Sequence, residues 1–175
     1  MEKHSIHVFE PSGPPEEDVL ERNLQALRIA GFEVDYTPLQ TDARGRLERD
    51  GVRTRLEEVQ SALKSAHRYL LSARGGYGVS ELMSQLDWQT LAQNPAKVLI
   101  GFSDVSALQS AMFARLGWPS LHAPMPGSPL WQGGADVVEL IDLLSSDRPW
   151  RGEFEVTPVR ETTVTECQGV LFGGC

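Results

Sequence analysis

Along the chain, short apolar runs typical of strands alternate with segments in which apolar residues recur at helical spacing. Short β-rich runs favour strands, and between them apolar residues recur at the spacing of one helix face. In residues 52–66 this face contains Val52, Leu56, Val59 and Leu63. The expected strands are residues 6–9, 32–36, 68–73, 98–100 and 117–122, and the expected helices are residues 14–30, 52–66, 79–86, 104–116 and 135–144.

Strands that alternate with helices predict a parallel sheet, because parallel strands need helical crossovers. Right-handed crossovers place helices on both faces. We therefore expect a doubly wound, mostly parallel α/β fold of the flavodoxin-like or class I glutamine amidotransferase-like kind. Residues 1–150 form this N-terminal domain. Beyond a break near Trp150, residues 151–175 alternate like antiparallel strands, and we interpret them as a linker and the first strands of a second, β-rich domain that this chain lacks.

The net charge argues against a nucleic acid as the partner of this protein. The 175 residues carry a net charge of −8, whereas a nucleic-acid surface needs a basic face. The polar segment 41–50 is expected to be a solvated excursion. Cys167 and Cys175 are interpreted as free thiols of a reducing compartment. No zinc spacing, signal-peptide core or membrane span is recognisable, so we expect a cytoplasmic protein without a metal.

The segment 97–108 carries the first chemical candidate. A short apolar strand runs through Gly101 into a helix, with Ser103 at the corner. A serine on such a turn can present its hydroxyl as a nucleophile, with the amides of the first helical turn beside it. Serine is also a preferred N-cap residue, so Ser103 as a helix cap is the alternative interpretation.

Two further loops are expected at the same edge of the sheet, where ligands of open α/β sheets bind. One is the segment around Ser12, and the other contains Arg74, Gly75, Gly76 and Tyr77. Backbone amides of the glycine-rich loop can face a carbonyl or an anion, although the loop can equally be a tight turn. It matches neither a dinucleotide fingerprint nor a P-loop pattern.

A serine nucleophile needs a base, usually a histidine that a carboxylate orients. His4 and His67 are expected at the surface, and His7 is expected to be packed or capped within the first strand. His122 ends the fifth strand and is the one histidine expected at the active edge, where it can also serve to support a loop. These residues do not complete a catalytic triad.

The ordered motifs resemble those of the LD-carboxypeptidases, a serine peptidase family that includes the microcin-immunity peptidases. The resemblance covers most of the chain and rests on segments 10–13, 73–78, 86–88, 100–108 and 122–125. It implies that Ser103 is the nucleophile. It also implies an oxyanion hole formed by the Asp104 amide and an amide of the Gly75–Gly76 turn.

Two residues depart from the family pattern, Glu10 in place of the usual alanine and Ala123 in place of a common glycine. The larger departure is that the family's catalytic glutamate and histidine come from a C-terminal domain, which begins after a segment resembling residues 173–175. The resemblance therefore implies a chain with nucleophile and oxyanion hole but without the base, and nearly inactive by itself.

The implied reaction removes a terminal D-alanine from the L-centre of diaminopimelate in cytoplasmic murein tetrapeptides during cell-wall recycling. Substrate-binding candidates are Ser12, Arg74, Tyr77 and His122. No cofactor, nucleic acid or membrane is expected, and the full-length protein is expected to be a homodimer. The alternatives are immunity-type cleavage of a peptidyl nucleotide, and a non-catalytic module that holds a small carboxylate or phosphate ligand.

Overall fold

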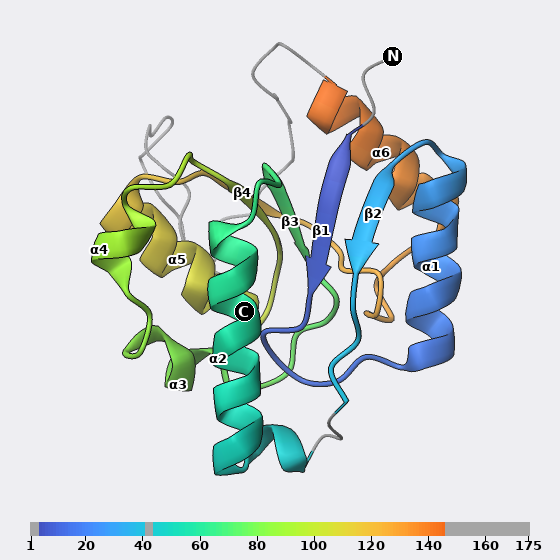
Figure 1. The fold of residues 1–175 in the computed structure, drawn as a ribbon. Coiled ribbons are helices and arrows are strands. Elements are labelled where there is room, and N and C mark those ends of the chain that lie inside the picture. The colour runs from blue at the N-terminus through green and yellow to red at the C-terminus, as the bar shows by residue number, and fades with distance from the viewer. Residues whose placement is uncertain (1–3, 41–43, 146–175) are drawn as a thin grey trace, which may run out of the picture.

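The computed structural model describes residues 4–40 and 44–145, which form one five-stranded sheet with helices on both faces (Figure 1). All strand pairs are parallel, in the order β2-β1-β3-β4-β5. The strands are β1 (Ser5–Phe9), β2 (Glu33–Tyr36), β3 (Tyr69–Ser72), β4 (Val98–Gly101) and β5 (Ser120–His122). The predicted parallel, doubly wound α/β fold is confirmed.

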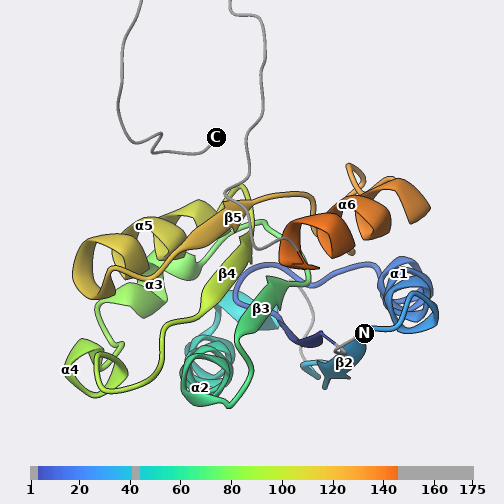
Figure 2. The same ribbon diagram turned by 90° about the horizontal axis from the view of Figure 1, so that it is seen from above.

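The helices form two layers, which Figure 2 shows end-on. Helices α2 to α5 cover one face of the sheet, and α1 and α6 cover the other. The helices are α1 (Glu17–Ile29), the 3-10 turn η1 (Gly45–Leu47), α2 (Arg49–Lys64), α3 (Val79–Met83), α4 (Trp88–Leu91), α5 (Val105–Leu116) and α6 (Gly134–Ser145). The short helix α4 falls where the sequence predicts only a turn, and the side chain of Asp87 caps it by accepting from the Thr90 amide.

Each face of the sheet has its own apolar core. Successive residues of a strand point to opposite faces, so Leu70 and Leu71 of β3 belong to different cores. Leu70 packs among the apolar residues of α2, α3 and α5, such as Val59 and Leu108. Leu71 packs against residues of α1 and α6, such as Leu24. This two-sided burial explains why β3 and β4 are short, mainly apolar runs rather than alternating ones.

Helix α5 is held against the sheet by one polar side chain. The buried amide nitrogen of Gln109 lies within 3.3 Å of the carbonyl oxygens of Leu99, Gly101 and Leu121. These carbonyls belong to β4 and β5, which lie side by side. The start of α5 is thereby fixed relative to the strand that precedes it, and Ser103 lies between the two.

The prediction of a solvated excursion over residues 41–50 is wrong for Arg46. This side chain is 2% exposed and pairs with the carboxylate of Glu10, which is 1% exposed. The charge-rich composition hid this inward arginine because charged residues are seldom buried without a partner. Residues 151–175, with their predicted strands and both cysteines, lie outside the described residues.

None of the helices in residues 4–40 and 44–145 is both long enough and apolar enough to cross a bilayer.

Candidate active site

The carboxyl ends of the strands form the edge at the bottom of Figure 1, where the loops after β1, β3 and β4 meet. The strand order changes direction between β1 and β3, which is where open α/β sheets bind ligands. The Ser12 loop follows β1, and the Gly75 loop follows β3. The backbone amide of Gly13 donates to the carbonyl oxygen of Gly75 at 3.2 Å, so the two loops are joined.

Ser103 occupies a strained turn between β4 and α5. Its φ is 63°, and among the described residues it is the one non-glycine residue with positive φ. For an L-residue this left-handed conformation costs about 1–2 kcal/mol. The N-cap of α5 is Asp104 rather than Ser103, and within the described residues the N-cap side chain makes no capping hydrogen bond to this helix. The alternative that Ser103 is a helix cap is therefore contradicted, and backbone strain at this corner is typical of a functional turn.

Gly75 lies directly against Ser103. A Cβ built on Gly75 would meet Ser103 Cβ at 3.1 Å and Oγ at 3.3 Å, with Met125 Cε at 3.4 Å. A side chain at position 75 would therefore press on the hydroxyl group. Gly76 has a φ of 129° and lies so close to Gly13 that an added Cβ would meet the Gly13 nitrogen at 3.0 Å. The glycine-rich loop is consequently more than a tight turn, because it brings backbone up to the serine.

The carboxylate of Asp104 joins three parts of this edge. Its Oδ2 accepts from the hydroxyl of Ser12 at 2.8 Å and from the backbone amide of Val79 at 3.1 Å. Ser12 is fully buried, so its side chain holds Asp104 in place. A contact of Ser12 with substrate stays a prediction. The side chain of Asp104 takes part in these hydrogen bonds. The oxyanion-hole role expected for this residue would therefore be carried by its backbone amide.

Arg55 holds these loops together by hydrogen bonds from its side chain. Its guanidinium is fully buried and donates to the carbonyls of Pro11 and Arg46 and to Glu81 Oε2. Gly78 has a φ of 111°, which favours glycine, and a Cβ on it would overlap the guanidinium of Arg55. Arg55 thus connects the segment after β1 to the start of α3.

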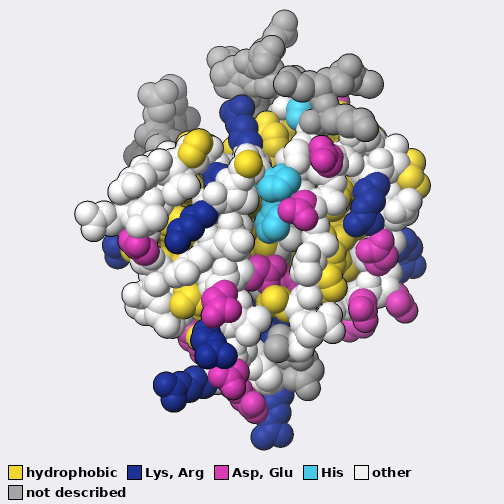
Figure 3. All heavy atoms as spheres, in the orientation of Figure 1, with side chains coloured by type: hydrophobic (Ala, Val, Ile, Leu, Met, Phe, Trp, Pro, Cys, Tyr) yellow, Lys and Arg dark blue, Asp and Glu magenta, His cyan; other side chains and the backbone are white. Residues whose placement is uncertain are grey.

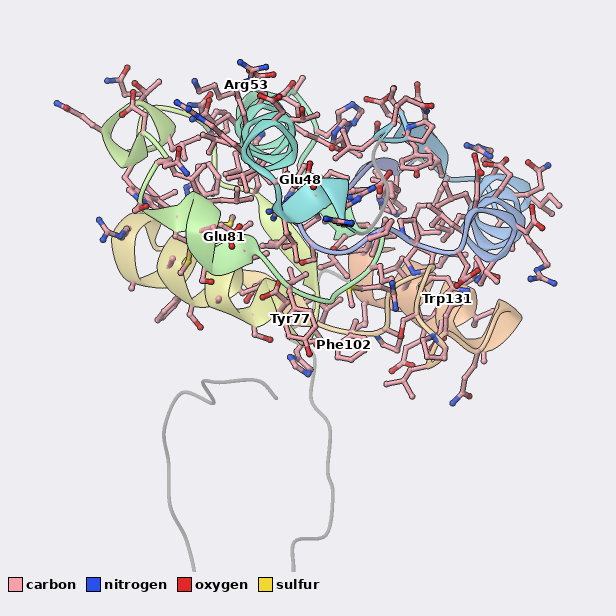
Figure 4. All side chains as sticks on the ribbon, turned by 90° about the horizontal axis from the view of Figure 1, so that it is seen from below. Glu48, Arg53, Tyr77, Glu81, Phe102 and Trp131 are labelled. Carbon is pink, nitrogen blue, oxygen red and sulfur yellow. The ribbon has the colours of Figure 1, made fainter. Side chains whose placement is uncertain are left out.

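The remaining substrate-binding candidates lie at the exposed edge of the site. Tyr77 is 81% exposed, and Figure 4 shows it and Phe102 on the same side of the molecule. His122 is exposed, and its ring packs edge-on against Phe102, the neighbour of Ser103, with 6.0 Å between centroids. Arg74 is exposed, and its guanidinium donates to the Pro14 carbonyl at 2.7 Å. All three lie at the predicted edge, and their contacts with a substrate stay predictions.

A buried polar network beside the site escaped prediction. Glu10 pairs with Arg46 and also accepts from the hydroxyl of Tyr36 at 2.7 Å and the amide of Leu39 at 3.0 Å. Burial raises the pKa of the Tyr36 hydroxyl, with a further contribution from its bond to Glu10. Glu10, Tyr36 and Arg46 line a pocket of about 250 Å³ next to β1 and β2, to which Ser103 does not contribute. Glu10, which stands where the family usually has alanine, is therefore paired with an arginine from a distant segment.

Comparison with known proteins assigns the chain to a family. Residues 6–123 match the sequence profile described as the LD-carboxypeptidase N-terminal domain. The murein tetrapeptide carboxypeptidase of Pseudomonas aeruginosa is 33% identical over 177 residues, which cover 97% of this chain and 57% of that protein. A putative carboxypeptidase of Streptomyces coelicolor is 36% identical over 125 residues, which cover 69% of this chain and 40% of that protein. The chain thus spans about half the length of these relatives.

Solved structures agree on the fold. Microcin C7 self immunity protein MccF, in complex with glutamyl sulfamoyl guanosine, superposes with a TM-score of 0.69 at 22% identity over 83% of this chain and 45% of that one. A muramoyltetrapeptide carboxypeptidase from Oxalobacter formigenes superposes with a TM-score of 0.65 at 23% identity, covering 81% of this chain and 48% of that one. The profile match over residues 6–123 and the Pseudomonas aeruginosa relative show that the chain belongs to the LD-carboxypeptidase family.

Proposed function

We propose that the chain is the nucleophile-bearing part of a serine-type LD-carboxypeptidase that removes the terminal D-alanine of murein tetrapeptides in the cytoplasm. The observation that carries this proposal is the strained turn at Ser103, with φ of 63°, against which Gly75 packs without a side chain. The murein tetrapeptide carboxypeptidase of Pseudomonas aeruginosa, at 33% identity, supports the substrate class. We place the nucleophile domain in residues 1–150 and the lead into a C-terminal domain in residues 151–175.

In the proposed reaction, Ser103 Oγ attacks the carbonyl carbon between diaminopimelate and D-alanine while a base takes the hydroxyl proton. The negative charge that develops on the carbonyl oxygen is stabilised by the amides of Asp104 and of the Gly75–Gly76 turn. One such donor contributes about 10²–10³ in kcat in serine proteases. D-alanine leaves after taking up a proton, and water then hydrolyses the acyl-enzyme.

The base and its orienting carboxylate are the histidine and glutamate that the family resemblance places in a C-terminal domain. Without them, a chain retains only the contribution of binding and of the oxyanion hole, which is about 10³–10⁴-fold over water in serine proteases. The 175-residue chain by itself should therefore be nearly inactive. The complete protein should be active, and the resemblance leads us to expect it to be a homodimer.

The test is an assay of D-alanine release from murein tetrapeptide by the product of the complete reading frame that contains these residues. We expect Ser103→Ala to lower kcat by about 10⁴-fold or more. Ser106→Ala is the matched control, because Ser106 is on the helix that follows Ser103, and its hydroxyl is buried and bonds to none of the described residues. Full activity of Ser103→Ala would exclude the proposed mechanism.

The assay also separates the alternatives. A peptidyl nucleotide substrate would be cleaved in a Ser103-dependent way while tetrapeptide is left intact. A non-catalytic binding module would show neither reaction, and a serine-reactive phosphonate would fail to label it. Its ligand would instead raise the midpoint of thermal unfolding.

A further inference from the structure

Two histidines and one aspartate meet on the open part of the sheet. His7 of β1 and Asp35 of β2 are directly opposite each other in the strand register, so their side chains point to the same face. His67 comes from the connection between α2 and β3. Figure 3 shows histidine and acidic side chains together on this face of the molecule.

The three side chains direct their ligand atoms at one point. His7 Nδ1 lies 2.8 Å and His67 Nε2 lies 3.2 Å from the same oxygen, Asp35 Oδ2, and all three atoms lie within 4.8 Å of one another. Nitrogen and oxygen ligands at about 2.0–2.2 Å from a zinc ion are separated by about 2.9–3.4 Å in octahedral or tetrahedral geometry. The two observed nitrogen-to-oxygen distances are at or near this range.

Neighbouring polar groups orient His67 as a ligand. Ser5 Oγ lies 2.8 Å from His67 Nδ1 and can accept its proton, which leaves the lone pair of Nε2 free. The backbone carbonyl of His67 is fixed by Lys97 Nζ at 3.0 Å. Asp35 is about half exposed, and an exposed carboxylate is ionised at neutral pH, so it can bind a cation.

The side chains are also accessible to an ion. His7 and His67 are 18% and 22% exposed and Asp35 is 52% exposed, so the remaining coordination positions can be filled by water. Two imidazoles and one carboxylate suit zinc, nickel, copper or iron, whereas magnesium and calcium prefer oxygen ligands. The sequence offered no spacing for such a site because the three ligands come from three separate segments.

We propose that His7, Asp35 and His67 bind one divalent first-row transition-metal ion, which links the edge strand β2 to β1 and to the segment before β3. The site is separate from the loops that carry Ser103, Gly75 and Ser12, so it is independent of the proposed peptidase reaction. Its role is structural. The ion stabilises the folded state because the unfolded chain does not hold the three ligands together.

The test is zinc titration of the protein, purified without a polyhistidine tag and stripped with a chelator, followed by calorimetry at pH 7.5. We expect one equivalent to bind with a Kd of about 10 µM or tighter, to raise the midpoint of thermal unfolding, and to bind much more weakly at pH 5.5, where protons compete for imidazole. Cobalt in place of zinc should give a visible absorption band from the same site.

The variants assign the ligands. Asp35→Asn and His67→Gln should each weaken zinc binding at least about 100-fold, and Ser5→Ala about tenfold, since it removes only the partner of His67. His122→Ala is the control, because His122 is an exposed histidine at the end of β5, which β3 and β4 separate from β1, and the variant should leave zinc binding unchanged. Circular dichroism confirms that each variant is folded. Absence of zinc binding below 100 µM, or binding that survives both Asp35→Asn and His67→Gln, would leave only a hydrogen-bonded triad and overturn the proposal.

Discussion

The hydroxyl of Ser12 donates a hydrogen bond of 2.8 Å to Oδ2 of Asp104, which lies 92 residues further along the chain. Ser12 belongs to the loop after β1, and Asp104 is the N-cap of the helix that follows Ser103, the proposed nucleophile. The bond therefore crosses the point where the strand order reverses. The position of the Ser103 turn therefore depends on the packing of a loop near the amino terminus.

Asp104→Ala should destabilise the protein by about 2–3 kcal/mol, because the buried Ser12 hydroxyl and the Val79 amide both lose their acceptor. Ser12→Ala should cost about 1 kcal/mol, since it removes the donor together with its need for a partner. The double variant should be more stable than the sum of the single losses by about 0.5–3 kcal/mol. Urea unfolding of the four proteins measures this difference, and simple additivity would show that the bond is absent in solution.

Gly75→Ala should lower kcat/KM of the complete enzyme by about tenfold or more. The new Cβ would lie 3.1 Å from Ser103 Cβ, so the serine must move, and catalysis is sensitive to small displacements of a nucleophile. Gly134→Ala is the control, since no atom of the described residues lies within 4 Å of a Cβ at that position. A steady-state assay with both variants decides the matter. Wild-type activity of Gly75→Ala would mean that the turn is not adjacent to the reacting atoms.

Ser103→Gly should be more stable than Ser103→Ala by about 1 kcal/mol, although both lack the hydroxyl. Glycine adopts a φ of 63° without the steric cost that any Cβ incurs. The same comparison at Ser110, inside α5, should have the opposite sign, because glycine costs about 1 kcal/mol relative to alanine within a helix. Thermal unfolding of the four variants provides the test. Equal stability of the two variants at position 103 would show that the turn is unstrained.

The sheet and the location of the site could be predicted because they depend on local patterns. Strand 98–101 is a run of apolar residues that ends in glycine, and the next residues begin a helix. Parallel connection then brings the loops after β1, β3 and β4 to one edge by topology alone. The placement of Ser103, Gly75 and Ser12 near one another follows from these two facts.

The partners of buried charges could not be predicted in the same way. Arg55 lies on the inward side of α2, four residues before the buried Val59, so helical spacing was a usable signal. Its acceptors, however, are carbonyls of distant loops, which no spacing reveals. The pairing of Glu10 with Arg46 and the meeting of His7, Asp35 and His67 likewise depend on contacts between segments far apart in sequence.

Glu10→Ala should destabilise the protein by about 3–5 kcal/mol, because it leaves the charge of Arg46 buried without its carboxylate. A double variant with Arg46→Met should recover part of this loss, since neither charge of this pair then remains buried. Glu21→Ala removes the exposed partner of Arg28 and should cost about 0.5 kcal/mol or less. Denaturant unfolding measures all three. A double variant no more stable than Glu10→Ala would show that the ion pair is not the main contribution of Glu10.

The last prediction concerns Glu58, which lies beside this network. Its Oε1 accepts from the backbone amide of Glu10 at 3.1 Å, and its Oε2 is buried without a partner among the described residues. Burial raises the pKa of Glu58 to about 7, and the nearby Glu10 carboxylate adds to the effect. The folded state therefore holds a proton that the unfolded chain releases near pH 4.5.

Because the folded state binds more protons between these two values, stability should fall as pH rises from about 4.5 to about 7 and then level off. Glu58→Gln should remove this slope, since an amide keeps an oxygen acceptor for Glu10 and has no charge to bury. The variant should match the wild type at pH 4.5 and exceed it at pH 8 by up to about 3 kcal/mol. Unfolding at both pH values measures the difference, with the exposed Glu57→Gln as control. An equal change in stability at both pH values would mean that folding does not raise the pKa of Glu58.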